Sequence, residues 1–475
     1  MVTSEAHPFA KTGGLAEVAA SLSDALARLG HDVTLVLPRY RGIDTAGTTA
    51  ARATIEMGWR SQVVTFRTRA LKERLSAVFV DIPEFFDRDG LYGADGQDYP
   101  DNALRFAVLA RAALEHARLR GKRPSVIHAH DWQTGLVPVY QKMHLSSDPI
   151  VGGVPVVFTV HNLAFQGVFP ASVVPAIGLE WDVLHVQALE YWGQVSYLKG
   201  GVNFSETITT VSPTYAREIV TPDLGFGLEG VLARRAGDLV GILNGIDTDR
   251  WNPAADPFVS AKYDASNLAG KAAAKEALLE AVNLPRDKAA LSRPVVGLIS
   301  RLTDQKGFDL ISSAAADLMS MDAGWVMIGS GERRYEELLR DLAARNPQTV
   351  SATIGFDERL AHLIEAGADL FLMPSRFEPC GLNQMYSLRY GTVPVVRAIG
   401  GLDDTVRDVD EPGGNGNGFK FAEYSPAALV ATLRRALTAY HNRAAWKKIQ
   451  QRGMRLDHSW DASAREYVKV YRRTR

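Results

Sequence analysis

Two cations and one carboxylate in the second half of the chain are the clearest candidates for a chemical site. Arg301 and Lys306 lie five residues apart after the apolar run 294–300, and Glu378 lies farther along. An arginine can bind a phosphate through two parallel hydrogen bonds, and a lysine can approach it as a point charge. On their own, two such cations could be a solvated surface pair. Beside a helix start with free N–H groups, they would form a diphosphate site.

Glu378 lies in a segment that offers such a helix start. The segment Pro374–Gln384 follows the apolar run 369–373, which is short enough for a buried parallel strand, and residues 382–390 favour a helix. Open parallel sheets bind ligands at the carboxyl ends of their strands, and Gly381 would let a ligand approach the first N–H groups of the helix. We therefore predict one half of a chemical site around Glu378.

A second helix start with anion-binding character lies near the N-terminus. The segment Lys11–Gly14 lies between a predicted strand end (1–4) and a predicted amphipathic helix (15–29). Its lysine and its glycines, Gly13 and Gly14, offer a positive charge and accessible N–H groups to an anion. The turn lacks the P-loop spacing, and taken alone it could be a tight turn beside a solvated lysine.

Polar residues also follow two neighbouring strands of the first half. His130 and Asp131 come at the end of the apolar run 126–130, and His161 and Asn162 come directly after the run 155–160. One such residue is more often a helix cap or a satisfied polar group than a catalytic one. Two adjacent strand ends that both carry histidine favour a ligand site.

A metal site built from His128, His130 and His161 is the alternative interpretation. Period-two alternation places His128 and His130 on the same face of a buried strand. Because no acidic residue or cysteine stands at ligand spacing, we rank a metal site below a site for an organic ligand.

The remaining pattern predicts repeated strand and helix units on both sides of a boundary near residue 245. In the first half, residues 53–81 alternate as β-structure, residues 87–102 form a long functional loop that holds Tyr92, and residues 104–119 form a helix. The other predicted strands are 33–37, 206–212, 239–243, 294–300, 325–329, 349–354, 370–373 and 393–396. Residues 412–418 are expected to form a flexible loop without chemistry of its own, and residues 446–471 an amphipathic helix.

Composition excludes several classes of function. The chain has 475 residues, of which 46% are hydrophobic, a formal net charge of -1 and a single cysteine, Cys380. Such a chain can bury large cores, and its near-neutral net charge does not indicate binding to nucleic acid or to a membrane surface. No intramolecular disulfide is possible, and no apolar run reaches the ~18 residues of a membrane span. We expect a soluble cytoplasmic protein.

Several motifs, in order along the chain, resemble those of bacterial glycogen synthases, also called starch synthases, within the GT-B glycosyltransferases. These motifs are Lys11–Leu15, His130–Trp132, His161–Asn162, Asn244–Asp247, Arg301–Thr303 with Gln305–Gly307, and Pro374–Gln384. The resemblance extends from the first residues to about residue 460. Three positions depart from it: Glu17, Phe356 and Asn417 stand where aspartate, tyrosine and threonine are frequent.

The resemblance implies an α/β fold of two Rossmann-like domains with parallel sheets that face a central cleft. Residues 1–245 would form the N-terminal acceptor and catalytic domain, and residues 246–455 the nucleotide-sugar domain. Residues 456–475 would form a C-terminal helix that packs back across the junction.

The resemblance also implies a reaction. Glucose would pass from ADP-glucose to the non-reducing-end 4-OH of an α-1,4-glucan with retention of configuration, without a metal or any other cofactor. The implied catalytic residues are Arg301, Lys306, Glu378, His161 and Asp131. The implied donor-binding residues are Lys11, Gly13, Gly14, Asn162, Asn244, Phe356, Cys380, Gly381, Leu382 and Asn383. The implied acceptor-binding residues are Asp131, Trp132 and Tyr92.

Within this implied set, the two cations would grip the diphosphate from one domain and Lys11 from the other. His161 and Asn162 would hold glucosyl hydroxyls, and Glu378 would anchor the donor sugar. Retention could use either a carboxylate nucleophile or attack from the same face of the sugar.

Three rival functions remain open at this point. One is another GT-B enzyme that uses UDP-glucose or a small acceptor such as a sugar phosphate. A second is a glucan-binding protein with a degenerate site, which the complete set of cations and carboxylate disfavours. The third, a nicotinamide-linked oxidoreductase, is disfavoured because no G-x-G-x-x-G motif follows the first strand.

Overall fold

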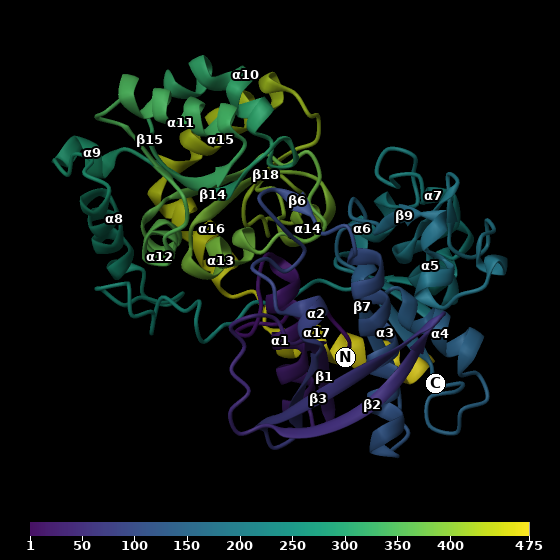
Figure 1. Cartoon of the computed structure of the whole chain (residues 1–475). Coiled ribbons are helices and arrows are strands. Elements are labelled where there is room, and N and C mark those ends of the chain that lie inside the picture. The colour runs from purple at the N-terminus through teal and green to yellow at the C-terminus, as the bar shows by residue number, and fades with distance from the viewer. Residues whose placement is uncertain (475) are drawn as a thin grey trace. The chain divides into compact units, whose positions relative to one another are not determined.

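The computed structural model describes residues 1–474, which divide into two compact units (Figure 1). Unit 1 comprises Met1–Leu243 and the C-terminal residues from Trp460 onward, and unit 2 comprises Asn244–Ser459. Each unit has a sheet with parallel strands and helices packed against it. The predicted α/β class is therefore confirmed.

The sheet of unit 1 consists of two four-stranded parts that the N-terminal segment joins. The strands of the first part, in spatial order, are β1 (Val33–Pro38), β4 (Leu75–Asp81), β3 (Arg60–Lys72) and β2 (Thr49–Met57). The parallel second part follows the order β13 (Leu239–Gly241), β12 (Thr207–Thr210), β8 (Val156–Val160) and β7 (Ile127–His130). Val2 makes parallel bridges to Val36 and Ala129, so the predicted first strand is reduced to a single bridging residue.

Helices and small hairpins surround this sheet. The helices of unit 1 are α1 (Gly14–Arg28), α2 (Pro83–Phe86), α3 (Asn102–Arg120), α4 (Leu136–His144), α5 (Tyr197–Phe204), α6 (Pro213–Glu218), α7 (Glu229–Arg234) and α17 (Trp460–Thr474). The small strands are β5 (Gly93–Ala94), β6 (Gln97–Asp98), β9 (Val168–Pro170), β10 (Glu190–Tyr191) and β11 (Gln194–Ser196). None of the helices within residues 1–474 is both long and apolar enough to cross a membrane.

The C-terminal helix α17 belongs to unit 1, where it packs against α1. Val18 and Leu22 of α1 share a buried cluster with Ala464 and Val468 of α17. The single helix predicted over residues 446–471 is wrong, because the chain leaves the helical path between α16 and α17. There the Asp457 carboxylate accepts the Ser459 N–H, a local bond that competes with helix continuation.

Unit 2 is a six-stranded parallel sheet covered on both faces. Its strands, in spatial order, are β16 (Val350–Ile354), β15 (Gly324–Gly331), β14 (Val295–Leu302), β17 (Leu370–Met373), β18 (Val393–Arg397) and β19 (Phe419–Phe421). Its helices are α8 (Ala269–Ala281), α9 (Lys288–Ser292), α10 (Phe308–Met319), α11 (Arg333–Arg345), α12 (Glu358–Gly367), α13 (Asn383–Tyr390), α14 (Gly400–Thr405), α15 (Pro426–Tyr440) and α16 (Arg443–Met454). Alternate residues of β14 point to opposite faces: Val296 packs in one apolar cluster and Val295 in the other.

The strand order of unit 2 reverses between β14 and β17. From β14 the chain proceeds to β15 and β16 on one side, and from β17 it proceeds to β18 and β19 on the other. The carboxyl ends of strands at such a reversal are the usual ligand position in open parallel sheets. Arg301 lies near the end of strand β14, directly before Leu302, Lys306 lies in the loop that follows, and the loop after β17 contains Glu378.

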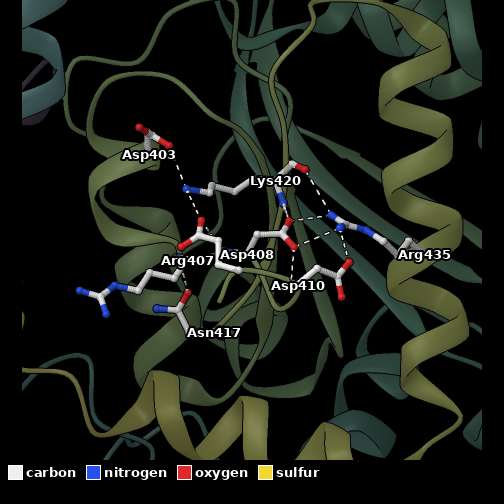
Figure 2. Close-up of polar contacts among 8 residues, drawn as sticks. Asp403, Arg407, Asp408, Asp410, Asn417, Lys420 and Arg435 are labelled. Carbon is white, nitrogen blue, oxygen red and sulfur yellow. Dashed lines mark hydrogen bonds and ion pairs between the residues drawn. The ribbon is translucent and has the colours of Figure 1, made fainter. Parts of the chain in front are cut away.

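The glycine-rich loop 406–418 of unit 2 is held by buried polar contacts (Figure 2). The Asp408 carboxylate accepts hydrogen bonds from the Arg435 guanidinium at 2.6 and 3.0 Å and from the Lys420 N–H at 2.6 Å. Buried Asn417 accepts from the Arg407 N–H at 2.8 Å and donates to the Thr405 carbonyl at 3.1 Å. Hydrogen bonds therefore hold this loop at both ends. The sequence predicted only that residues 412–418 are flexible and did not indicate these hydrogen bonds.

Candidate active site

The two predicted phosphate-binding cations lie at the reversal point of unit 2 but differ in their surroundings. The exposed Arg301 guanidinium donates to the Gln305 side chain at 3.3 Å. The Lys306 ammonium, whose side chain is 19% exposed, donates to the Glu378 carboxylate at 2.5 Å. Arg301 is therefore free to reorient toward a ligand, whereas Lys306 is already held by a carboxylate.

Glu378 is the buried member of this pair. Its side chain is only 6% exposed, and it also accepts a hydrogen bond from the Ser375 hydroxyl at 3.1 Å. A buried carboxylate needs such partners, because removal of one of them leaves an uncompensated charge. The structure thus brings the predicted residues Lys306 and Glu378 into direct contact.

Close packing of two loops produces this contact. Gly307 has a φ of 79°, and a Cβ atom there would lie 2.1 Å from the Pro374 carbonyl oxygen. Only glycine fits both the left-handed conformation and the close approach. The Arg376 N–H donates to the Gln305 carbonyl at 2.9 Å, which joins the same two loops. Lys306 and Glu378 are therefore positioned by backbone contacts on both sides.

A row of backbone N–H groups lies beside this ion pair. The N–H groups of residues 380–383, which precede and open α13, donate to no acceptor among residues 1–474. Gly381, with a φ of 71°, turns the chain into the helix. Successive unbound N–H groups at a helix start favour an anion such as a phosphate. The arrangement fits the predicted role of Cys380, Gly381, Leu382 and Asn383.

The side chains around this row fix its backbone. The Asn383 amide donates to the Ile299 carbonyl at 2.8 Å, and the Gln384 amide donates to the carbonyls of Cys380 and Gly381 at 3.0 Å each. Burial raises the pKa of the Cys380 thiol to about 12, and the backbone of Asn244 hydrogen-bonds to it. The thiol is therefore protonated at neutral pH and acts as a small buried group rather than a nucleophile.

Two further predicted donor-binding residues of unit 2 have opposite environments. Phe356 follows β16 and is 79% exposed, an unusual state for a large apolar ring. Asn244 is buried, and its side-chain oxygen has no hydrogen-bond partner among residues 1–474. An exposed ring offers a stacking surface, and an unsatisfied buried amide oxygen offers an acceptor.

In unit 1, Asp131 links the ends of β7 and β8. Its carboxylate accepts the His161 N–H at 2.7 Å, and its own N–H donates to the Thr159 carbonyl at 2.9 Å. The backbone has φ 57° and ψ 179°, a conformation that non-glycine residues adopt at a cost of about 1–3 kcal/mol. Burial raises the pKa of the Asp131 carboxyl to about 7, against the lowering effect of the N–H groups of His161 and Asn162.

Three histidines lie next to one another behind Asp131. The His130 Nδ1 lies 3.0 Å from the His161 Nε2, and the His128 and His130 ring centroids are 4.0 Å apart. His128 also hydrogen-bonds to the hydroxyls of Thr159 and Tyr471. The ring nitrogens of His128 are thus engaged by hydroxyl groups. Within residues 1–474, no group of three or more His, Cys, Asp or Glu side chains has the geometry of a metal site.

Asn162 and Trp132 flank this cluster. The Asn162 side-chain oxygen accepts the Ala164 N–H at 3.0 Å, which leaves its NH₂ group for a ligand. The Trp132 ring packs on Gly167 and lies edge-on to Phe106 at a centroid distance of 5.0 Å. The ring is half-buried, so one part of it is held while another remains accessible.

The predicted anion-binding turn of unit 1 is engaged by carboxylates of the same unit. The Lys11 ammonium donates to Glu17 at 2.6 Å, and both side chains are partly exposed. The Thr12 N–H and hydroxyl donate to Glu5 at 2.6 Å each, and the Gly13 N–H donates to it at 3.3 Å. A phosphate at this turn would therefore have to compete with Glu5 and Glu17 for the same donors.

Glu5 is a residue that the sequence reasoning missed, and it explains the position of Tyr92. The Tyr92 hydroxyl donates to Glu5 at 2.5 Å and lies 2.8 Å from the Ser4 hydroxyl. The predicted acceptor-binding tyrosine is thus attached to the anion-binding turn through a shared carboxylate. The available signal was the position of Glu5, an acidic residue directly after the first bridging segment and six residues before Lys11.

The fold and the reversal-point site define the class of protein, and comparison with known proteins agrees. Residues 1–234 match the family model described as the starch synthase catalytic domain, and residues 284–452 match glycosyl transferases group 1. A solved structure of the catalytic domain of starch synthase IV from Arabidopsis thaliana, bound to ADP and acarbose, superposes with a TM-score of 0.89. It has 35% sequence identity, and the match covers 100% of this chain and 98% of that one. The chain is a glycosyltransferase with the GT-B fold.

Relatives of known name specify the family. A glycogen synthase of Anaeromyxobacter dehalogenans (strain 2CP-C) is 50% identical, over 99% of this chain and 98% of the relative. A glycogen synthase of Koribacter versatilis (strain Ellin345) is 44% identical, over 99% and 97%. The chain therefore belongs to the glycogen and starch synthase family. The predicted family, fold class and enzyme class are confirmed, which argues against the oxidoreductase alternative.

Proposed function

We propose that the protein transfers glucose from ADP-glucose to the non-reducing-end 4-OH of an α-1,4-glucan with retention of configuration. The observation that carries this proposal is the site of unit 2, where two cations and unbound N–H groups lie beside a buried carboxylate. A departing nucleoside diphosphate gains negative charge in the transition state, and preorganised donors lower that barrier. The names of the relatives and the ADP bound in the Arabidopsis structure support the choice of donor and acceptor.

The groups that we propose for donor binding differ between the two units. In unit 2, Arg301 and the N–H groups that open α13 would bind the diphosphate. Lys306 would neutralise the charge that develops on it. In unit 1, His161 and Asn162 would bind hydroxyl groups of the glucosyl unit, since their environment suits neutral partners. Phe356 would stack on the adenine.

Glu378 would act as a ligand of the donor sugar rather than as a general acid. Lys306 and Ser375 already donate hydrogen bonds to its carboxylate, so its oxygens are held in position. This arrangement suits an acceptor of sugar hydroxyl hydrogens. Attack from the same face of the sugar then needs no enzyme nucleophile, and the attacking 4-OH can pass its proton to the leaving phosphate oxygen.

We propose that the reaction needs no metal and no cofactor, because the protein's own cations face the diphosphate. Transfer that continues unchanged in excess EDTA supports this proposal. Loss of transfer in EDTA that Mg²⁺ restores would overturn it.

A donor and acceptor panel tests the reaction. The purified protein is given ADP-glucose or UDP-glucose, each with glycogen, maltooligosaccharides or glucose 6-phosphate, and nucleoside diphosphate release is measured. We expect fast ADP release only with the glucans. Fast UDP release with negligible ADP release would overturn the donor assignment, and transfer to the sugar phosphate would overturn the acceptor assignment. A Lys306→Ala, Glu378→Ala double variant with wild-type transfer would overturn the site.

A further inference from the structure

The chemistry of His161 depends on a second histidine that has no assigned role. His130, the last residue of β7, is completely buried, and its ring lies between those of His128 and His161. Its Nδ1 lies 3.0 Å from the His161 Nε2. Its other nitrogen, Nε2, has no hydrogen-bond partner among residues 1–474.

Both rings are neutral in the folded protein. Burial lowers the pKa of His130 well below its usual value of 6.5, with a further contribution from the neighbouring histidines. Burial also lowers the pKa of His161 to about 3. Each neutral imidazole has one N–H and one bare nitrogen, so only one of the two facing nitrogens can carry a hydrogen.

Two arrangements satisfy the 3.0 Å contact, and they differ in what is left unpaired. If His161 donated from Nε2, the hydrogen of His130 would reside on its Nε2, and a buried N–H would have no acceptor. If His130 donates from Nδ1, its Nε2 is a bare nitrogen, and only a lone pair is unpaired. Orphaned buried N–H groups are rarer in proteins than under-used acceptors, so the second arrangement is favoured.

We propose that His130 is a positioning residue that holds His161 in its Nδ1–H tautomer, so that His161 presents a hydrogen-bond donor to the ligand. The His161 side chain is only partly buried, and its Nδ1 has no partner among the described residues. Its Nδ1–H is therefore available. This tautomer follows from unit 1 alone, whereas the identity of the ligand as a hydroxyl of the donor sugar rests on the proposed function.

A fixed donor makes a specific demand on the sugar. A hydroxyl oxygen that accepts from His161 can be replaced by fluorine with partial retention of binding, because fluorine accepts weakly, but not by hydrogen. If His161 were an acceptor instead, the fluoro and deoxy analogues would be equally poor. ADP-sugar analogues with a deoxy or a deoxyfluoro substitution at each hydroxyl position distinguish these cases. Their inhibition constants are measured, because binding does not depend on the effect of fluorine on the rate of transfer.

The tautomer itself is measured by ¹⁵N NMR on the histidine-labelled full-length protein, assigned with a His161→Ala variant. We expect a protonated Nδ1 and a bare Nε2 for His161. In His130→Leu, which removes the donor, the two tautomers of His161 should mix. In His130→Asn, whose amide N–H can replace Nδ1–H, the Nδ1–H form should return. An Nε2–H tautomer of His161 in the wild type, or a tautomer unchanged in His130→Leu, would overturn the proposal.

Kinetics provides the functional arm. We expect His130→Leu to raise KM for ADP-glucose about tenfold, the value of one hydrogen bond, and to erase the difference between the fluoro and deoxy analogues. His130→Asn should restore both. If His130→Leu does not fold, the NMR spectrum of the wild-type protein still tests the tautomer of His161, and the analogue series still tests its contact with the sugar. A correct tautomer together with indifference to every sugar analogue would overturn the proposed sugar contact but leave the tautomer in place.

Discussion

The strand ends of the two units are polar in different ways. In unit 1, the groups at the ends of β7 and β8 hydrogen-bond to one another, and burial keeps the histidines neutral. In unit 2, the groups at the ends of β14 and β17 and in the loops that follow are a lysine–carboxylate pair, an exposed arginine and a row of unbound N–H groups. The strand ends of the two sheets thus carry chemically different groups. A neutral, desolvated set suits sugar hydroxyls, and a cationic set suits phosphates.

The difference follows from what lies at each strand end. Buried rings without a charged partner lose their protons because desolvation penalises the charged form. Lys306 instead lies 2.5 Å from the Glu378 carboxylate. The unit 2 site is therefore built on an ion pair, whereas burial keeps the histidines of the unit 1 site neutral. Substitutions that change charge should accordingly have their largest effect in unit 2.

Lys306→Ala tests this expectation at its strongest point. We expect kcat/KM for ADP-glucose to fall about 10³-fold, the upper range for loss of one preorganised charge-stabilising group, because Glu378 is also left unpaired. Steady-state ADP release measures the effect. Lys447→Ala, at an exposed position on α16, is the matched control and should behave as wild type. A loss of less than tenfold in Lys306→Ala would show that unit 2 does not depend on this charge.

Asp131→Asn tests the site of unit 1. This substitution keeps the shape of the side chain and removes only its charge. We expect kcat/KM to fall about 10²-fold, a value within the range for loss of one positioned acid–base group. In the wild type, activity should rise with pH through about 7 as the carboxyl ionises. In Asp131→Asn this rise should be absent. A variant with the wild-type pH profile would assign the titration to another group.

Asp131→Asn should lower activity but raise the thermal stability of the protein at high pH. The pKa of Asp131 is raised from 3.8 to about 7 in the folded protein, so between these values the folded state holds a proton that the unfolded chain has lost. Stability from this group is therefore greatest below the lower value and decreases as the pH rises to the higher one. Thermal unfolding at pH 8 should show a higher Tm for Asp131→Asn than for wild type, and the gap should close near pH 4. A lower Tm at pH 8 would contradict the raised pKa.

Phe356→Ala should have a smaller effect, confined to binding. Stacking of a base on an aromatic ring contributes about 1–3 kcal/mol, so we expect KM for ADP-glucose to rise about tenfold with little change in kcat. Phe356→Tyr retains the ring and is the matched control. Equal losses in the two variants would remove the stacking role, and a fall in kcat alone would place the ring near the reacting atoms.

The elements and their loops were predictable because apolar runs and glycine-rich turns are local signals. The runs before Asp131, His161 and Glu378 fall on β7, β8 and β17, so these three residues follow the strands from which they were predicted. Contacts between distant residues were not predictable. Nothing local indicates that Tyr92 and Glu5, 87 residues apart, form a hydrogen bond, nor that Lys306 and Glu378, 72 residues apart, form an ion pair.

The helical tail shows a different limit of sequence reasoning. Residues 446–471 have helical periodicity throughout, yet the helix breaks at residues 455–459, where the Asp457 carboxylate accepts the Ser459 N–H. Helix α16 belongs to unit 2 and helix α17 to unit 1. Periodicity indicates which face of a segment is buried but not against which unit it is buried.

Cys380→Ser is the smallest change in this series and separates geometry from reactivity. Burial raises the pKa of the thiol to about 12, so no thiolate exists at neutral pH for catalysis to use. A serine hydroxyl is of similar size and can accept the hydrogen bond from the Asn244 backbone, so kcat/KM should change by less than about threefold, within the contribution of one hydrogen bond. Cys380→Leu, which is too large for the buried position, should lose far more because it displaces the N–H groups that open α13. Complete loss in Cys380→Ser would mean that the unit 2 site uses the sulfur itself, and the contrast between a charged site and a neutral one would no longer account for its chemistry.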